Sequence, residues 1–186
     1  MRGRSLSIAL FCLVSMAASA QIPTRGTIFL GYSYMSADNN SGSRPNLNGW
    51  NGSLEGKFLP WVGIVADLSG QYGSSDVSLA CPQTCPTSHP SEHMLNVLFG
   101  PQVSVPVGKL TPFAHILGGA SHLNIGSTSL TSSASDTSFG DAIGGGFDYK
   151  LVPMIAWRVQ ADLLQTRFFS NTQNNFRLAT GIAFHF

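Results

Sequence analysis

The chain has 186 residues, and only 10% of them are charged, whereas about 25% of the residues of an ordinary globular domain are charged. Its ten Lys and Arg residues nearly balance nine Asp and Glu residues, so the charge gives no reason to expect a nucleic-acid partner. The length fits one domain, and after residue 20 no apolar stretch is long enough for a membrane-spanning helix.

The N-terminus has the three parts of a secretory signal peptide. Arg2 and Arg4 supply the positive start, an apolar stretch follows, and the small residues Ala-Ser-Ala at 18–20 form a cleavage site. We therefore expect residues 1–20 to be a cleaved signal peptide and residues 21–186 to form one domain. Cleavage removes two basic residues and leaves eight basic side chains against nine acidic ones.

Eight segments in which apolar and polar side chains alternate follow the signal peptide. Each is about ten residues long, which is the length that a tilted strand needs to cross a bilayer. In chain order they span residues 27–35, 50–58, 62–72, 93–104, 111–124, 139–149, 157–163 and 175–186. Because successive side chains of a strand point to opposite faces, each segment has one apolar face suited to lipid.

The fifth segment is ambiguous, because both of its faces carry apolar residues. Either the face with Ala114 and Ile116 or the face with Phe113 and Leu117 could point outward. We favour the arrangement that directs His115 inward. In the other seven segments one face is consistently apolar.

The connections between the segments alternate in length. The short ones follow the second, fourth and sixth segments and contain turn residues: Leu59-Pro60, Pro106-Val107-Gly108 and Leu151-Val152-Pro153. The others are polar and mostly longer, at residues 37–48, 73–92, 125–138 and 170–174. Short turns at one end and long loops at the other are typical of outer-membrane barrels, whose short turns face the periplasm.

The last segment ends in two aromatic residues, Phe184 and Phe186, on its apolar face. Lipid cannot hydrogen-bond an open strand edge, so we expect this segment to pair with the first one. The sequence therefore predicts an all-β fold, an eight-stranded antiparallel up-and-down transmembrane β-barrel in a bacterial outer membrane. Aromatic residues near the strand ends fit the girdles at the two interfaces with water; they are Trp50, Tyr72, Trp61, Tyr149, Trp157 and Phe186.

Three stretches carry a family resemblance: "TIFLGYSYM" after the signal peptide, hairpins such as "GWNGSLEGKFLPWVGIVADLSGQYG", and the terminal "GIAFHF". With these stretches the chain resembles the small outer-membrane barrels of the OmpA and OmpX kind, within the outer membrane protein beta-barrel domain family. The resemblance covers essentially the whole mature chain. It implies that the final strand, with Phe184 and Phe186, is the signal read by the barrel-assembly machinery.

Seven charged side chains point into the barrel on this assignment of the faces. They are Glu55, Lys57, Asp67, Asp148, Arg158, Asp162 and Arg177. Buried charges must be paired and eight strands leave little room, so we expect an ion-pair network that fills the lumen. The alternative is a narrow polar pore for small solutes or ions, lined by the same residues.

The two cysteines that remain after cleavage, Cys81 and Cys85, share the longest loop in the stretch "CPQTC". In an oxidising compartment a disulfide between them is the simplest interpretation. A zinc site would need more ligands than these, and the nearby His89 and His93 lie on a loop where their spacing does not make them converge. We therefore expect a disulfide and no metal.

An enzyme on this scaffold would need a nucleophile and a base at the outer rim, and pairs such as Ser121 with His122 or Ser91 with His93 could supply parts of one. Ser and His are common in polar loops, and no cofactor-binding motif is present. We expect a monomeric, non-enzymatic barrel without catalytic residues or cofactor, whose partners are membrane lipid and the assembly machinery. Its loops would serve a structural or surface-interaction role. The alternatives are the narrow pore, a rim-located enzyme, and a secreted lipocalin-like barrel with its apolar face inside.

Overall fold

Strands dominate the part of the chain that the computed structural model describes, which is residues 25–38, 44–74, 77–78, 87–88, 90–127 and 133–186. Eight of them form one closed antiparallel barrel in the order β1-β10-β9-β8-β7-β6-β3-β2. These strands are β1 (Gly26–Ser36), β2 (Asn46–Lys57), β3 (Val62–Ser74), β6 (Ser91–Ser104), β7 (Leu110–Ile125), β8 (Ala134–Val152), β9 (Ile155–Thr166) and β10 (Gln173–His185). The predicted eight-stranded up-and-down barrel is confirmed.

The remaining elements lie in the connections. The short strands β4 (Val77–Ser78) and β5 (Thr87–Ser88) pair with each other between β3 and β6. A 3-10 turn, η1 (Phe168–Ser170), lies between β9 and β10. None of the described residues belongs to a helix that is long and apolar enough to span a membrane.

The barrel closes between its first and last strands. Residues 27–36 of β1 pair with residues 176–185 of β10 in an unbroken antiparallel register. Next to this ladder, Gly26 N donates to Phe186 O at 2.9 Å, and Phe186 N donates to Gly26 O at 3.0 Å. The final residue is therefore hydrogen-bonded, and the edges of β1 and β10 pair with each other along their length.

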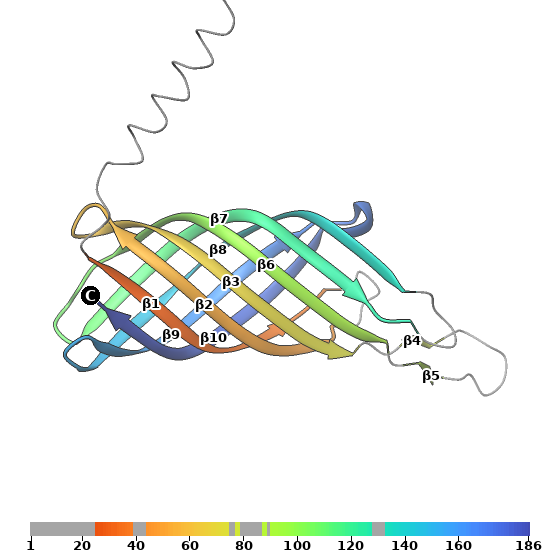
Figure 1. The fold of residues 1–186 in the computed structure, drawn as a ribbon, viewed down its shortest axis with the longest axis horizontal. Helices are drawn as coiled ribbons and strands as arrows, with labels where there is room; N and C mark the ends of the chain where they lie inside the picture. The colour runs from red at the N-terminus through yellow and green to blue at the C-terminus, as the bar shows by residue number, and fades with distance from the viewer. Residues whose placement is uncertain (1–24, 39–43, 75–76, 79–86, 89, 128–132) are drawn as a thin grey trace, which may run out of the picture.

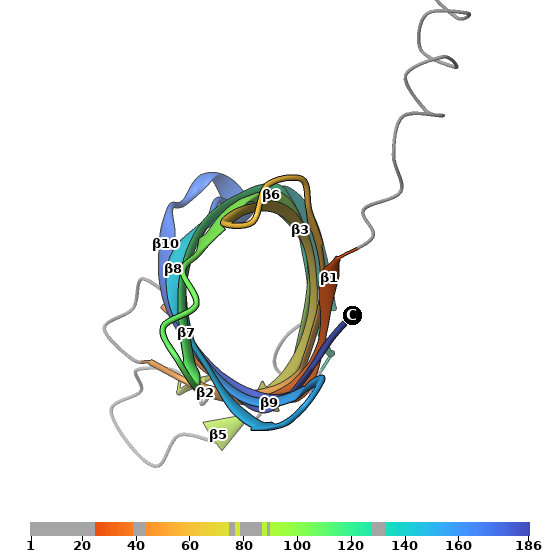
Figure 2. The ribbon, with the colours of Figure 1, turned by 90° about the vertical axis from the view of Figure 1, so that its left-hand side faces the viewer.

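The two ends of the barrel differ (Figure 1). The connections 58–61, 105–109 and 153–154 are short, and they lie at the left in Figure 1, where β1 begins and β10 ends. We call this the short-turn end and the opposite one the long-loop end. Figure 2 looks along the barrel from the short-turn end. In outer-membrane barrels the short turns face the periplasm, which places both ends of the barrel domain on that side.

The strands run further toward the long-loop end than the alternation of apolar residues predicted. β2 begins at Asn46 instead of residue 50, and β8 begins at Ala134 instead of residue 139. The added ladder pairs polar residues, such as Asn124 with Ser135. Apolar alternation marks the stretch of a strand that faces lipid, whereas backbone pairing continues into water beyond it.

The outer wall is apolar, and the inward-pointing side chains are buried. Large side chains such as Leu30 and Ile116 are each 61% exposed on the outside. The ambiguity in the fifth segment is resolved: Phe113, His115 and Leu117 of β7 point inward and are buried. The lipid-facing side of every strand is therefore assigned.

Candidate functional site

The interior of the barrel is the first place to look for a functional site, because it holds all seven of the charged residues that the sequence predicted there. Six of them are at most 3% exposed, and the side chain of Lys57 is 17% exposed. The structure brings them together in a central cluster, a second group nearer the short-turn end, and a separate pair, Glu55 with Lys57.

The central cluster is built around Arg177 of β10. Its guanidinium reaches across the lumen to β3, where Nη1 donates to Asp67 Oδ1 at 2.8 Å and to Ser69 Oγ at 2.8 Å. On the other side, Nε donates to Asp162 Oδ2 of β9 at 2.9 Å. One fully buried cation thus joins two carboxylates from strands that are not adjacent.

Further polar side chains contact the carboxylates of this cluster. His115 Nε2 donates to Asp162 Oδ1 at 2.8 Å, because a carboxylate oxygen only accepts. Asn51 Nδ2 donates to Asp67 Oδ2 at 2.8 Å, and Gln160 Nε2 donates to Asp162 Oδ2 at 2.9 Å. His115 was predicted to point inward, but neither it nor these amides were predicted to belong to the network, although their positions on the inward faces could have indicated them.

The second group is built around Arg158 of β9. Its guanidinium makes two parallel hydrogen bonds to Asp148 of β8, at 2.6 and 2.7 Å. It also lies 5.3 Å from the ring centroid of Phe29 and 4.4 Å from that of Phe113, in cation–π geometry. His185 Nε2 lies 3.4 Å from Asp148 Oδ2 and connects the group to the short-turn mouth.

Glu55 and Lys57 of β2 form the longest ion pair of the interior. Lys57 Nζ lies 3.9 Å from Glu55 Oε1 and donates to Ser104 Oγ of β6 at 2.8 Å. Glu55 is 1% exposed, and its Oε1 atom has no hydrogen-bond partner. This buried carboxylate therefore depends on Lys57 for its compensation.

The layer between the two ends is tightly packed. Its largest side chains, including Arg158, Arg177, Gln71, Gln102 and Gln160, are all at most 2% exposed. A void wide enough for water would leave accessible surface on the side chains that line it. The packed layer therefore leaves no continuous file of water between the two mouths.

An apolar layer lies on the long-loop side of the charged one, and the sequence did not predict it. It includes Met35, Leu47 and Met94 from three strands. Phe168 of η1 is fully buried in this cluster and covers it from the loop side. No sequence pattern could have indicated Phe168, because its position depends on the path of an irregular loop with left-handed φ angles at Phe169 and Ser170.

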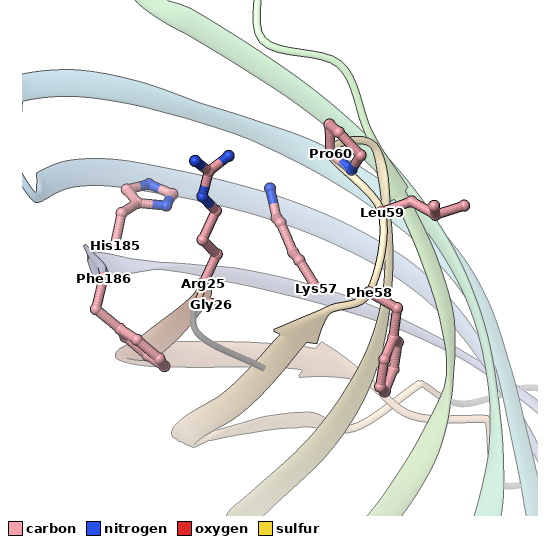
Figure 3. A pocket seen from close by; sticks show the side chains of 8 residues that line it. All are labelled: Arg25, Gly26, Lys57, Phe58, Leu59, Pro60, His185 and Phe186. Atoms are coloured by element: carbon pink, nitrogen blue, oxygen red, sulfur yellow. The ribbon is translucent and has the colours of Figure 1, made fainter. Parts of the chain in front are cut away.

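Cavities open at both mouths and share no lining residue across the barrel. At the short-turn end one cavity of about 580 Å³ adjoins another of about 260 Å³, and Lys57 and His185 line both. Figure 3 shows the larger one. At the long-loop end a cavity of about 220 Å³ has Phe168 and Met94 in its wall.

Several residues that the sequence analysis considered do not form a site. Cys81, Cys85 and His89 lie outside the described residues, as does the signal peptide. His93 packs edge-on against Tyr72, with ring centroids 5.2 Å apart. His122 is exposed and its Nδ1 lies 2.7 Å from Thr137 Oγ1, whereas Ser121 is buried on the opposite face. In the described part of the chain no three potential metal ligands are grouped.

Comparisons with known proteins agree with this geometry. The model of the outer membrane protein beta-barrel domain matches residues 6–186. Among solved structures, the chain is similar to Neisserial surface protein A (TM-score 0.63, 10% identity, covering 87% of this chain and 96% of that one). It is also similar to OprG from Pseudomonas aeruginosa (TM-score 0.60, 14% identity, covering 87% of this chain and 95% of that one). A third similar structure is Ail of Yersinia pestis (TM-score 0.57, 15% identity, covering 86% of this chain and 98% of that one). No curated protein matches the sequence.

Proposed function

The chain belongs to the outer membrane protein beta-barrel domain family and is located in the bacterial outer membrane, and from this basis we propose that it is a non-enzymatic barrel with a structural or surface-interaction role. In this proposal the barrel wall and its packed interior form a rigid support. The loops at the long-loop end carry the interactions, as exposed loops on rigid scaffolds commonly do.

The observation that carries the proposal is the filled lumen. Arg177 spans it, and the charged layer around this residue excludes water between the two mouth cavities. A pore for solutes needs a continuous polar path, whereas this interior is arranged as a core. The closed interior therefore favours a supporting role over the narrow pore that is the main alternative.

Single-channel conductance in a planar bilayer tests this proposal. We expect the refolded mature protein to show no steady openings, with heat-modifiable gel mobility as the check that it is folded. The matched variant removes the three charged groups of the central cluster together, Arg177→Ala with Asp67→Ala and Asp162→Ala, which thins the packed layer without leaving one of them as an unpaired charge. We expect this variant to conduct.

Each result has a defined meaning. A silent wild type together with a conducting variant would show that the side chains themselves close the barrel. Steady openings of the wild type would overturn the supporting role and establish the pore, with Lys57, Arg158 and Asp162 as its lining.

The charge of the long-loop end limits the partners that it can take. Among the described residues this end carries four acids, Asp38, Glu92, Asp136 and Asp141, and two bases, Arg44 and Arg167. The related fold of Ail was solved in complex with the heparin analogue sucrose octasulfate. An excess of acidic groups repels such a polyanion, so we propose a neutral or cationic partner for this chain.

The final strand supports a second part of the proposal, assembly as a monomer through the barrel-assembly machinery. Phe184 and Phe186 point outward and are 43% and 50% exposed. β10 pairs with β9 through one edge and with β1 through the other, and in this proposal the machinery binds the edge that β1 covers when the barrel closes. The same outward rings fit a membrane surface once the barrel is closed.

A further inference from the structure

We propose that the short-turn mouth is a binding site for the head group of an anionic glycerophospholipid of the periplasmic leaflet. The site is the cavity of about 580 Å³ in which Arg25, Lys57 and His185 meet. We call it the basic mouth site. It is distinct from the loop surface to which the proposed function refers.

Three nitrogen-bearing side chains from the ends of neighbouring strands or the residue next to one converge on this cavity. Figure 3 shows the guanidinium of Arg25, the ammonium of Lys57 and the ring of His185 directed into the same space. Arg25 precedes β1, Lys57 ends β2 and His185 ends β10, and these three strands are neighbours in the barrel. Barrel closure is therefore what assembles the site.

The cations of the basic mouth site are only partly compensated by the protein. None of the ion pairs among the described residues involves Arg25, which is exposed. Lys57 has one carboxylate partner at 3.9 Å, beyond hydrogen-bond distance. Lys150 adds a further positive charge in the adjoining cavity. A phosphate group in this space would gain charge-assisted hydrogen bonds that the protein leaves unmade.

Aromatic side chains on the outer face of the barrel lie next to the site. Phe58 and Phe186 also line the cavity, and in Figure 3 their rings extend to the side opposite the nitrogen groups of Arg25, Lys57 and His185. They are 59% and 50% exposed, and Trp61 in the same turn region is 53% exposed. Aromatic rings at this height mark the boundary between lipid and water. A phospholipid can therefore lay its chains against the outer wall while its phosphate reaches the cations.

The charges of the whole barrel favour an anion at this end. Among the described residues, the unburied charged side chains of the short-turn end are all basic: Arg25, Lys57, Lys109 and Lys150. The carboxylates of this end, Glu55 and Asp148, are 1% and 3% exposed. The long-loop end has the opposite excess, with four acids and two bases. An anionic head group is attracted to the first end and repelled from the second.

Quenching of tryptophan fluorescence by brominated lipid tests the basic mouth site directly. The chain has three tryptophans, and Trp50→Phe with Trp157→Phe leaves Trp61 as the only reporter, next to the lining residue Pro60. The protein is refolded into phosphatidylcholine vesicles that contain brominated phosphatidylglycerol or, in parallel, brominated phosphatidylcholine. We expect Trp61 to be quenched more strongly by the anionic lipid at equal content, and the preference to fall as salt is added.

Two charge-matched variants separate the site from general attraction. Arg25→Gln removes a cation from the cavity, and Lys109→Gln removes one from the same end outside it. We expect Arg25→Gln to lower the relative affinity for phosphatidylglycerol about fivefold, the effect of one basic residue at an anionic surface. Lys109→Gln should change it less than twofold. Lys57→Gln, checked for folding by heat-modifiable mobility, should lower it as Arg25→Gln does.

Three results would overturn the proposal. Equal quenching by the two brominated lipids in the wild type means that no anionic lipid is selected. Equal losses in Arg25→Gln and Lys109→Gln mean that only the overall charge of this end matters. An unchanged preference in both Arg25→Gln and Lys57→Gln means that the cations of the cavity do not bind the lipid.

Discussion

At the residue scale, the interior depends on side chains that compensate one another's charge. Arg177 is fully buried and holds Asp67 and Asp162 through hydrogen bonds of 2.8 and 2.9 Å. Each of these carboxylates would be costly without the cation, because burial removes the water that would otherwise solvate it. The attraction between Arg177 and the carboxylates therefore adds less to stability than removal of Arg177 would cost.

We expect Arg177→Met to lower the free energy of unfolding by about 3 to 5 kcal/mol, because two buried carboxylates lose their cation. Urea unfolding in detergent micelles, followed by tryptophan fluorescence, measures this change. The matched control is Arg167→Met, which breaks a pair with Asp141 whose side chains are 52% and 45% exposed and 3.8 Å apart. Exposed pairs of this kind contribute less than about 1 kcal/mol. Equal effects of the two variants would show that the central cluster is not a closed, desolvated network.

At the scale of the elements, two glycines, Gly31 and Gly181, face each other in the seam between β1 and β10. A Cβ atom on Gly181 would lie 2.2 Å from the carbonyl oxygen of Leu30 and 2.3 Å from the Cα of Gly31. These are backbone atoms of the partner strand, which cannot move aside as a flexible side chain can. The seam therefore has no room for a side chain at this point.

We expect Gly181→Ala to cost about 1 to 3 kcal/mol of stability, the usual range for an overpacked site, and to slow closure of the barrel. The folded fraction on unheated gels and the urea midpoint report these effects. Gly52→Ala is the control, since its Cβ would lie 3.3 Å from the flexible Cδ2 atom of Leu30. A Gly181→Ala protein as stable as Gly52→Ala would mean that the seam is looser than the register of β1 and β10 indicates.

At the scale of the whole molecule, the barrel has an apolar outside and a charged inside, which is the reverse of a soluble binding barrel. Leu163 of β9 is 60% exposed and is flanked on neighbouring strands by Ile143 and Phe176, which are 57% and 40% exposed. The lipocalin-like alternative would require such residues to face a ligand inside. The closed barrel and its apolar wall exclude this arrangement for the described strands.

We expect Leu163→Arg to impair assembly in the membrane, because a basic residue on the lipid face costs about 2 to 4 kcal/mol near the midplane. The measurement is the yield of heat-modifiable barrel in the outer-membrane fraction, with Leu163→Ala as the control for lost packing. Normal assembly of the arginine variant would contradict the assignment of the lipid-facing side of β9.

The sequence by itself determined the number of strands, the lipid-facing side of seven of them, and the alternation of short and long connections. These features are local: a period of two places every second side chain on one face, and a membrane requires the exposed face to be apolar. The predicted starts of β2 and β8, at residues 50 and 139, were too late in the chain, because backbone pairing continues where apolar alternation stops.

Only the tertiary structure decided which interior groups meet. Arg177 and Asp67 are 110 residues apart in the chain, and the stagger of the strands around the barrel, which no periodicity records, sets the layer that they share. The same stagger brings Arg25, Lys57 and His185 to one cavity. The path of a short irregular loop places Phe168 over the apolar layer. Alternation thus specifies the side to which a residue points, whereas barrel closure specifies the residues that it contacts there.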